Sequence, residues 1–600
     1  MGSTVSTLLH KQIAGGSFLL EDRAPEEVFT PEDFTDEQRQ IARTTEEFVT
    51  NEVVPFVDRL ERKDWELIRE LVRKAGELGL ISADFPEQYG GMGMDKISST
   101  IITDFISKYG SFGAAFNAQP GIGGMPIVYF GTEQQKRKYL PKVATGECLC
   151  ALALSESSSG SDAMSIRTRA VLSADGKHYV LNGEKLWVTN AAFADLFIVF
   201  AKVDGEKFTA FIVERNTSGL SIGAEEHKMG LRGSSTCPLV FNDCQVPVEN
   251  LLGEVGKGHL IGFNTLNIGR FKIGAGCVGG GRTTLEHAIA YAKQRKAFGK
   301  FIAEFGLIRE KLARMAAWLF AAESMVYRTV GMVSPALSAI DESAPEATKE
   351  RGKALAEYLV ECSIVKVAAT EMSCFIVDET VQIHGGYGFI EGYAAERSYR
   401  DARVGRIFEG TNEINRLIIP RWLLKRAQAG QVPLLPAIQQ VLGEVADGPG
   451  AATPLAGPLA AERALTEQAK KATLYAIGVA SRKYPQTLDD EQEVVAALAD
   501  MIIEVFAMDS AVIRARKIVA AQGEAAAAPA TAMAQIYAME AMVRLEAAAR
   551  KIVGAISEGD ILGAHMTALR RLFKYDPLNV IALHQKIAQH VLDRGKYNVV

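Results

Sequence analysis

One carboxylate of the chain is placed as a general base would be. Glu409 follows Ile407-Phe408 and precedes Gly410. Apolar neighbours remove water from a carboxylate, which favours its neutral form and raises its pKa toward neutrality. A glycine lets the backbone, and hence a ligand, come close. Glu409 is therefore a candidate general base that could remove a proton from carbon near neutral pH.

The same segment also fits the start of a helix. Glu409 and Glu413 would lie near the positive end of the helix dipole, with Thr411 or Asn412 as the cap. On the local sequence alone this is the simpler interpretation, so the rest of the chain has to decide.

Two segments between residues 150 and 190 offer groups suited to a flat, phosphorylated ligand. The polar loop Ser155–Asp162 supplies hydroxyl and backbone N–H donors. Trp187 and Thr189 alternate along an expected strand, so an indole and a hydroxyl share one face. A solvated turn and a core tryptophan are the alternatives for these two segments.

Further along, a basic cluster at Arg295–Lys300 ends an expected helix and could bind a diphosphate, or simply complement the helix dipole. Gln382–Gly386 is a turn whose glycines allow close approach. His384 has no partner at ligand spacing, so no metal site is expected. Gly274–Gly279 matches Gly-x-Gly-x-x-Gly, but both flanks are helical, which favours close helix packing over a dinucleotide site.

Composition narrows the class of protein. The 600 residues carry a net charge of -6 with acidic and basic residues interspersed, so no nucleic-acid partner is expected. The seven cysteines form no Cys-x-x-Cys pair, which indicates reduced thiols. No apolar run reaches membrane-spanning length and no signal or transit pattern stands at the N-terminus. A cytoplasmic protein is expected.

The patterning predicts a mainly helical α+β protein. Asn182-Gly183 between two apolar runs predicts a β-hairpin. The expected order is an N-terminal arm (1–34), an N-terminal helical domain (35–148), a middle antiparallel β domain (149–257), a second helical domain (258–430), a Pro-, Gly- and Ala-rich linker (431–460) and an extra C-terminal helical domain (461–600).

Taken together, these motifs resemble the acyl-CoA dehydrogenase family over roughly residues 36–430. The resemblance is strongest to the very-long-chain branch, which also has a helical extension. It rests on Ser158–Asp162, Lys185–Asn190, Gly306–Met315 and Arg406–Asn412. The family's usual Thr-Glu-Pro is Ser155–Ser157 here, and its Asn-Gly-Gly is Asn190–Ala192. The serine keeps the hydroxyl, but loop rigidity and the environment of the flavin could differ.

The resemblance implies noncovalent FAD between the β domain and the second helical domain. Glu409 would be the catalytic base that removes the α-proton of an acyl-CoA thioester while hydride passes to flavin N5. Its backbone N–H and a ribityl hydroxyl would polarise the thioester carbonyl. The implied cofactor contacts are Leu152, Leu154, Ser155, Ser161, Trp187, Thr189, Arg295, Phe298, Phe305, Gln382, Gly385, Gly386, Thr411 and Glu413, of which Arg295, Phe298, Phe305, Gln382, Gly385 and Gly386 would reach the FAD of a second subunit. The implied substrate contacts are Ser161, Arg270, Gly113, Asn117 and Gly410.

The resemblance also implies a homodimer, a role in fatty acid β-oxidation and electron transfer to an electron-transferring flavoprotein. Gly113 removes a plug from the acyl tunnel and favours long chains, whereas Asn117 is larger than the very-long-chain branch's glycine. In the very-long-chain branch the extension contributes to membrane association, which implies a peripheral membrane contact, but residues 431–460 here lack the basic polar face that favours such contact. An oxidase on the same fold and a scaffold protein that kept the fold are the alternatives.

Overall fold

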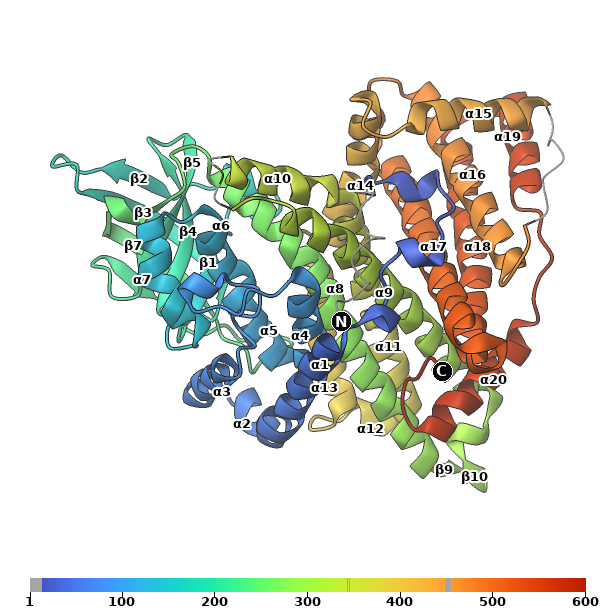
Figure 1. Cartoon of the computed structure of the whole chain (residues 1–600), viewed down its shortest axis with the longest axis horizontal. Coiled ribbons are helices and arrows are strands. Elements are labelled where there is room, and N and C mark those ends of the chain that lie inside the picture. The colour runs from blue at the N-terminus through green and yellow to red at the C-terminus, as the bar shows by residue number, and fades with distance from the viewer. Residues whose placement is uncertain (1–12, 343, 345, 448–454) are drawn as a thin grey trace, which may run out of the picture.

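The computed structural model describes residues 13–342, 344, 346–447 and 455–600. Residues 1–12 of the expected arm and 448–454 of the expected linker lie outside the described residues. Figure 1 shows the β domain at one end, long helices in the middle and the C-terminal helices at the other end. None of the helices in the described ranges has the length and apolarity needed to cross a bilayer.

The N-terminal helical domain begins where the sequence supplies caps. Thr35 and Gln38 form reciprocal hydrogen bonds at the start of the first helix, and Asp64 caps the third. Leu71 and Val72 of the third helix are buried, whereas Leu78, just after it, is half exposed. The helices are α1 (Asp36–Phe48), α2 (Val57–Glu61), α3 (Trp65–Glu77), α4 (Lys96–Ile106), α5 (Gly110–Asn117), α6 (Met125–Phe130) and α7 (Glu133–Ala144).

The middle domain is a single sheet in the order β6-β7-β3-β2-β4-β5-β8, with β1 also pairing with β4. The prediction of an antiparallel sheet needs one correction, because β1 and β2 both run parallel to β4. β1 pairs with Leu196–Val199 of β4 and β2 pairs with Lys202–Val203 further along the same strand, so the chain leaves β4 in the loop after β1 and rejoins it in the same direction. The strands are β1 (Cys150–Ala153), β2 (Arg169–Leu172), β3 (His178–Thr189), β4 (Leu196–Val203), β5 (Lys207–Glu214), β6 (Leu220–Ile222), β7 (Thr236–Pro247) and β8 (Leu251–Leu252).

The hairpin predicted at Asn182-Gly183 is wrong. β3 runs through both residues, and the register to β7 shifts between Leu181 and Gly183. Gly183 has φ 147°, and a Cβ there would lie 2.6 Å from the Thr168 hydroxyl. The glycine therefore permits a bulge under a neighbouring loop. β2 instead enters β3 through a turn at Gly176, which has φ 70°.

The second helical domain packs its long helices against one another at glycines. In α8, a Cβ on Gly274 would lie 2.3 Å from the Val365 side chain, and one on Gly279 would lie 1.8 Å from the Asp104 carbonyl oxygen. This confirms the packing interpretation of the Gly-x-Gly-x-x-Gly segment. The elements are α8 (Gly258–Gln294), β9 (Lys296–Ala297), β10 (Lys300–Phe301), α9 (Gly306–Ser338), α10 (Ala347–Glu357), α11 (Leu359–His384), α12 (Gly386–Phe389), α13 (Ala394–Ala402) and α14 (Asn412–Gln428).

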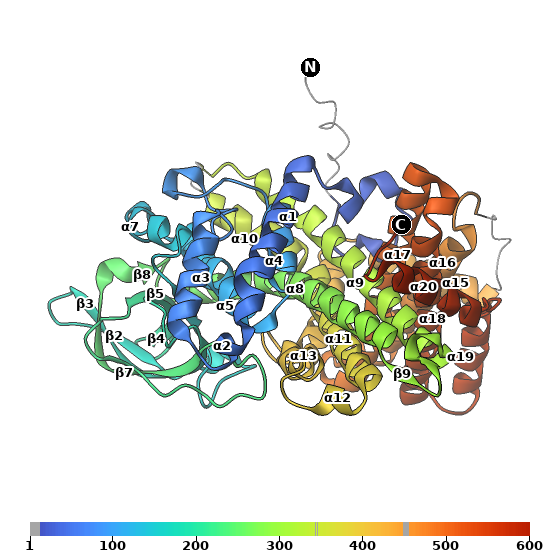
Figure 2. The ribbon, with the colours of Figure 1, turned by 90° about the horizontal axis from the view of Figure 1, so that it is seen from below.

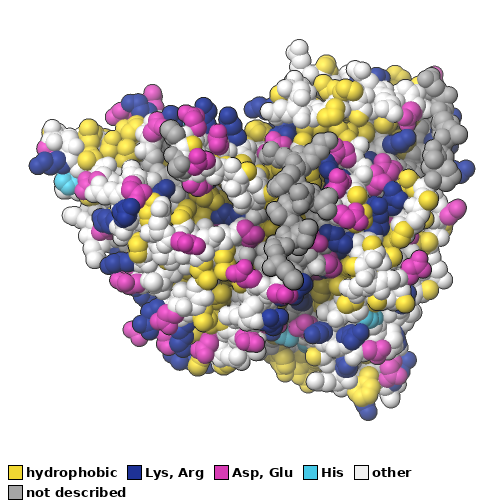
Figure 3. Space-filling view, viewed as in Figure 1, with side chains coloured by type: hydrophobic (Ala, Val, Ile, Leu, Met, Phe, Trp, Pro, Cys, Tyr) yellow, Lys and Arg dark blue, Asp and Glu magenta, His cyan; other side chains and the backbone are white. Residues whose placement is uncertain are grey.

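The C-terminal helices share a continuous core with the second helical domain. Arg514 is buried between Glu32 of the arm and Glu323 of α9, so three parts of the chain meet at one guanidinium. Figure 2 shows α17, α18 and α20 beside α9. On the face of the molecule seen in Figure 1, acidic and basic side chains are interspersed (Figure 3). The helices are α15 (Leu434–Asp447), which lies inside the expected linker, α16 (Ala460–Lys483), α17 (Gln492–Ala526), α18 (Ala528–Ile556), α19 (Gly559–Leu572) and α20 (Val580–Arg594).

Candidate active site

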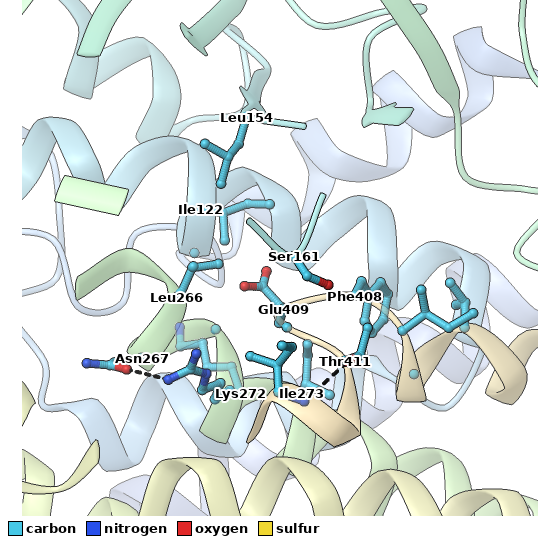
Figure 4. Close-up of a pocket in the computed structure, with 18 of the residues that line it drawn as sticks. Ile122, Leu154, Ser161, Leu266, Asn267, Lys272, Ile273, Phe408, Glu409 and Thr411 are labelled. Atoms are coloured by element: carbon cyan, nitrogen blue, oxygen red, sulfur yellow. Dashed lines mark hydrogen bonds between the residues drawn. The ribbon is translucent and has the colours of Figure 1, made fainter. Parts of the chain in front are cut away.

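A cavity of about 2350 Å³ opens where the N-terminal helices, the β domain and the second helical domain meet. Its centre is drawn in Figure 4, where the Glu409 carboxylate points into the space near Ile122, Leu266 and Ser161. The predicted site residues that line it are Gly113, Asn117, Leu152, Leu154, Ser155, Ser161, Trp187, Thr189, Arg270, Glu409, Gly410 and Thr411.

The backbone at Glu409 is held in an uncommon conformation. Glu409 has φ 56° and Gly410 has φ 80°, both in the left-handed region. For a glutamate this conformation carries a conformational cost, so its surroundings must enforce it. The Gly410 carbonyl accepts hydrogen bonds from Lys366 Nζ at 2.7 Å and from Asn415 Nδ2 at 2.8 Å. These two donors fix the turn that aims Glu409.

The segment also starts a helix, so the simpler interpretation of its sequence holds alongside the functional one. Thr411 caps α14 by accepting a hydrogen bond from the Ile414 N–H at 3.3 Å. The left-handed pair before the cap turns the chain sharply. As a result Glu409 projects into the cavity while α14 leads away from it.

The Glu409 carboxylate is enclosed and poorly solvated. Its Oε2 has no hydrogen-bond partner among the described residues, and a Cβ built on Gly269 of α8 would lie 3.0 Å from that oxygen. Burial raises the pKa of Glu409 to about 7, against the opposing positive charges of Arg270 and Lys366. A carboxylate with this pKa can exchange a proton near neutral pH.

Two cations lie behind this carboxylate. Arg270 of α8 is buried, donates to Asn267 Oδ1 at 2.9 Å, and has a pKa lowered by burial. Lys366 of α11 is fully buried, donates to Asn412 Oδ1 at 2.7 Å as well as to Gly410, and burial lowers its pKa to about 8. Both stabilise the charged form of Glu409 once the proton has left.

Trp187 and Thr189 enter the cavity from the β domain. The register between β3 and β7 shifts between Lys185 and Val188, and Trp187 within this bulge has φ 56°. The indole is 60% exposed although the next residue, Val188, is buried. A large exposed indole on a bulge beside a cavity is suited to stacking on a planar ligand.

The polar loop that begins at Ser155 is anchored by a buried ion pair. Glu156 accepts hydrogen bonds from Lys185 Nζ at 2.6 Å and from the Thr168 hydroxyl at 2.6 Å. The Ser155 carbonyl accepts from the Leu186 N–H at 2.9 Å. The loop is therefore attached to β3 close to Trp187, and this places Ser161 at the cavity.

The other predicted cofactor residues do not line this cavity. Arg295, Phe298 and Phe305 lie around the β9–β10 hairpin, where Phe298 is 94% exposed. The Arg295 guanidinium lies 5.8 Å from the Tyr387 ring. The remaining predicted residues outside the cavity are Gln382, Gly385 and Gly386 at the α11–α12 turn and the exposed Glu413 in the first turn of α14.

Sequence reasoning missed the residues that support Glu409 from other helices. Lys366 stands inside the apolar run Ile364–Ala369, and a lysine inside such a run was the available signal for a buried polar role. Gly269 gave no signal, because only the fold brings it against the carboxylate.

Family models match nearly the whole described fold. Acyl-CoA dehydrogenase models for the N-terminal domain (35–147), the middle domain (151–244) and the C-terminal domain (256–424) match in order, and a second C-terminal domain model of the family matches 468–571. The C-terminal helical extension therefore also matches a domain found in this family.

Individual relatives agree with the models. A probable acyl-CoA dehydrogenase of Bacillus subtilis is 48% identical over 98% of this chain and 98% of its own. The very-long-chain specific acyl-CoA dehydrogenase of Homo sapiens is 38% identical over 65% of this chain and 58% of its own. The crystal structure of an acyl-CoA dehydrogenase from Bacillus anthracis complexed with FAD has a TM-score of 0.96 and 48% identity, over 98% of this chain and all of that one. The chain belongs to the acyl-CoA dehydrogenase family.

Proposed function

We propose that this protein is an FAD-dependent enzyme that dehydrogenates fatty acyl-CoA thioesters between the α- and β-carbons, with Glu409 as the base. The observation that carries the proposal is the Glu409 carboxylate, enclosed at a cavity with its pKa raised to about 7 by burial. A general base operates best when its pKa is close to the working pH.

The cavity fits a flavin in size and in the chemistry of its lining. Its volume exceeds what an acyl chain alone would fill, and it combines the exposed Trp187 indole with the hydroxyls of Thr189, Ser155 and Ser161. These residues, with Leu152, Leu154 and Thr411, would hold the cofactor. FAD, when bound, accepts the hydride from the β-carbon.

The proton transfer follows from the residues of the chain. The Glu409 carboxylate takes the α-proton, and Lys366 and Arg270 moderate the rise of its pKa. The Glu409 N–H donates to no acceptor among the described residues, so it is available to the thioester carbonyl. Leu266, Ile273 and Ile122 line the cavity around this point and limit access of water.

Residues outside the cavity are assigned to a second subunit's cofactor. Phe298, Leu307 and Phe389 are 94%, 75% and 85% exposed and belong to the β9–β10 hairpin, the start of α9 and α12. The contact of Arg295 with the Tyr387 ring joins the hairpin to α12. An exposed cluster of large apolar side chains next to a cation favours an interface. We assign Arg295, Phe298, Phe305, Gln382, Gly385 and Gly386 to a homodimer contact that completes the FAD site.

A long acyl chain is the preferred substrate in this proposal. Gly113 and Asn117 line the cavity, and the Asn117 amide is tied to the Gly113 carbonyl at 2.8 Å and to the Thr103 hydroxyl at 3.0 Å. These bonds hold the Asn117 side chain back against its own helix and α4. In this proposal the reaction is a step of fatty acid β-oxidation, and an electron-transferring flavoprotein accepts the electrons from the reduced flavin.

The test is to purify the protein with FAD and to measure enoyl-CoA formation from butyryl-, octanoyl- and palmitoyl-CoA with an electron-transferring flavoprotein. We expect palmitoyl-CoA to give the highest kcat/KM. A maximum at butyryl-CoA would overturn the chain-length assignment. Oxygen-dependent peroxide release would identify an oxidase, and a protein that binds no flavin would identify a scaffold.

A further inference from the structure

The cavity extends well beyond Glu409, along one face of α14. Thr411, Ile414, Ile418, Trp422 and Lys425 all line it, and their spacing of three or four residues places them on one side of the helix. From the start of α14 to its end the helix rises about 24 Å. The space therefore continues from the base to the far end of this helix.

The outer wall of this space comes from the C-terminal extension. The residues that line it from the last turn of α16 and the connection to α17 are Ser481, Tyr484, Pro485, Gln486, Leu488 and Asp489. Butyryl-CoA dehydrogenase from Megasphaera elsdenii matches 65% of this chain over 99% of its own, which leaves that chain without residues to match this connection. The wall therefore comes from a part of this chain that this shorter relative lacks.

Positive charge dominates the outer part of the space. Arg421 and Lys425 of α14 line it with Lys349 and Lys353 of α10, whose Ala356 carbonyl accepts a hydrogen bond from Trp422 Nε1, and Lys257 lines the same cavity. Among the described residues, Lys353 and Lys425 have no carboxylate within 4.0 Å, whereas the three other cations each have one acidic partner. The excess positive charge fits a ligand end that carries several phosphates.

The extension also orients one of these cations. The Asp489 carboxylate lies 3.1 Å from Arg421 Nε, and the Asp489 carbonyl accepts a hydrogen bond from Arg421 Nη2. Leu488 next to it is buried, which fixes the connection against the protein. Arg421 Nη1 donates no hydrogen bond to any described residue and remains available to a ligand.

We propose that the segment Ser481–Asp489, which includes the end of α16, is part of the substrate site, where it walls the pocket for the phosphorylated nucleotide end of a CoA thioester and positions Arg421 toward it. The inference rests on the proposed function, and it assigns the extension a role in substrate binding. The thioester lies at Glu409, the pantetheine arm follows α14, and the nucleotide meets the extension.

The test compares acyl-CoA with the matching acyl-pantetheine, which lacks the nucleotide, on the FAD-loaded enzyme. We expect Asp489→Ala to raise KM for acyl-CoA about threefold, and Arg421→Ala to raise it tenfold or more, as for a lost charge-assisted hydrogen bond. KM for acyl-pantetheine and kcat for both substrates should stay within about twofold of wild type. Asp490→Ala is the matched control, because Asp490 is the exposed neighbour and does not line the cavity.

An Asp489→Ala variant with an unchanged KM for acyl-CoA, or with an equal rise for both substrates, would overturn the inference. If the wild type dehydrogenates no thioester, the proposed function fails instead. Calorimetric binding of CoA and of pantetheine then decides this inference separately. Weaker binding of CoA alone by Asp489→Ala supports it, and unchanged binding of CoA overturns it.

Discussion

The cavity around Glu409 and the hairpin end of α8 differ in how completely one chain builds them. At the cavity, α5, α8, α11, α14 and β3 converge, and the reactive carboxylate is enclosed with cations behind it. At the hairpin, Phe298 is 94% exposed and meets only the edge of the Phe305 ring among the described aromatic rings, and on α12 Phe389 is 85% exposed. The base is thus positioned within one chain, whereas the second group of predicted cofactor residues needs a surface from outside it.

Apart from replacing Glu409 itself, we expect the largest loss of activity from a substitution at Gly269, which contacts the Glu409 carboxylate. Gly269→Ala places a Cβ 3.0 Å from the carboxylate and forces it to move. We expect the rate of flavin reduction by acyl-CoA to fall about 10²-fold, since a shift of this kind misplaces the reacting atom. FAD content should stay normal.

Gly262→Ala in the same helix is the matched control, because its Cβ would meet only ordinary contacts at 3.6 Å. If Gly269→Ala reduces its flavin as fast as Gly262→Ala, the carboxylate is not held where this account places it.

A substitution at Lys366 tests whether the positive charge next to Glu409 sets the pKa of this carboxylate. Lys366→Met removes the donor to the Gly410 carbonyl and a positive charge that lowers the pKa of Glu409. The midpoint of the pH profile for flavin reduction should move upward from about 7, and the rate at neutral pH should fall about tenfold.

Lys470→Met removes a buried cation that pairs with Asp509 in the C-terminal helices, far along the chain from the base. It should lower stability without moving the pH profile. If Lys366→Met and Lys470→Met give the same pH profile for flavin reduction, Lys366 does not act on the pKa of Glu409.

The hairpin is tested through assembly. Phe298→Asp places a charge in the exposed apolar cluster, and we expect the dimer Kd to rise about tenfold or more, together with loss of FAD. Analytical ultracentrifugation with flavin absorbance measures both quantities. Ile561→Asp is the control, because Ile561 is 64% exposed on α19. A dimer that survives Phe298→Asp with full FAD would show that the hairpin is not the interface.

The smallest expected effect is on stability. Burial raises the pKa of Glu409 from 4.5 to about 7, so the folded chain binds more protons than the unfolded chain between these values, and stability falls as pH rises across this window. Glu409→Gln avoids this loss, so its gain in unfolding free energy over wild type should grow across the window to about 1–2 kcal/mol.

Thermal unfolding of the FAD-free protein at a series of pH values measures this gain. The pKa of Glu413 is lowered, mainly by a hydrogen bond from its own backbone N–H, so Glu413→Gln should give no gain at high pH. A gain for Glu409→Gln that does not depend on pH would contradict the raised pKa.

The sequence predicts most of the fold because caps, helical periodicity and strand patterns act locally. Thr35 and Asp64 begin helices with their own side chains. Asn182-Gly183 misleads because its glycine makes room for Thr168 in the loop before β2, a packing contact that no local pattern encodes.

The residues of the site also fall into those that the sequence indicates and those that only the fold reveals. Glu409, Gly410 and Thr411 stand together in the sequence, and their types suggest their roles. Gly269 and Lys366 act on Glu409 only through the packing of α8 and α11 against α14, so their roles became visible only in three dimensions.

The measurement that tests the central claim most directly is single-turnover mixing of Glu409→Gln and wild type with palmitoyl-CoA under anaerobic conditions in deuterated water. It follows flavin absorbance and deuterium at the α-carbon. With FAD content and fold retained, we expect the variant to reduce its flavin about 10²–10⁴-fold more slowly and to exchange no α-proton. A Glu409→Gln protein that bleaches and exchanges at the wild-type rate would contradict the assignment of Glu409 as the base.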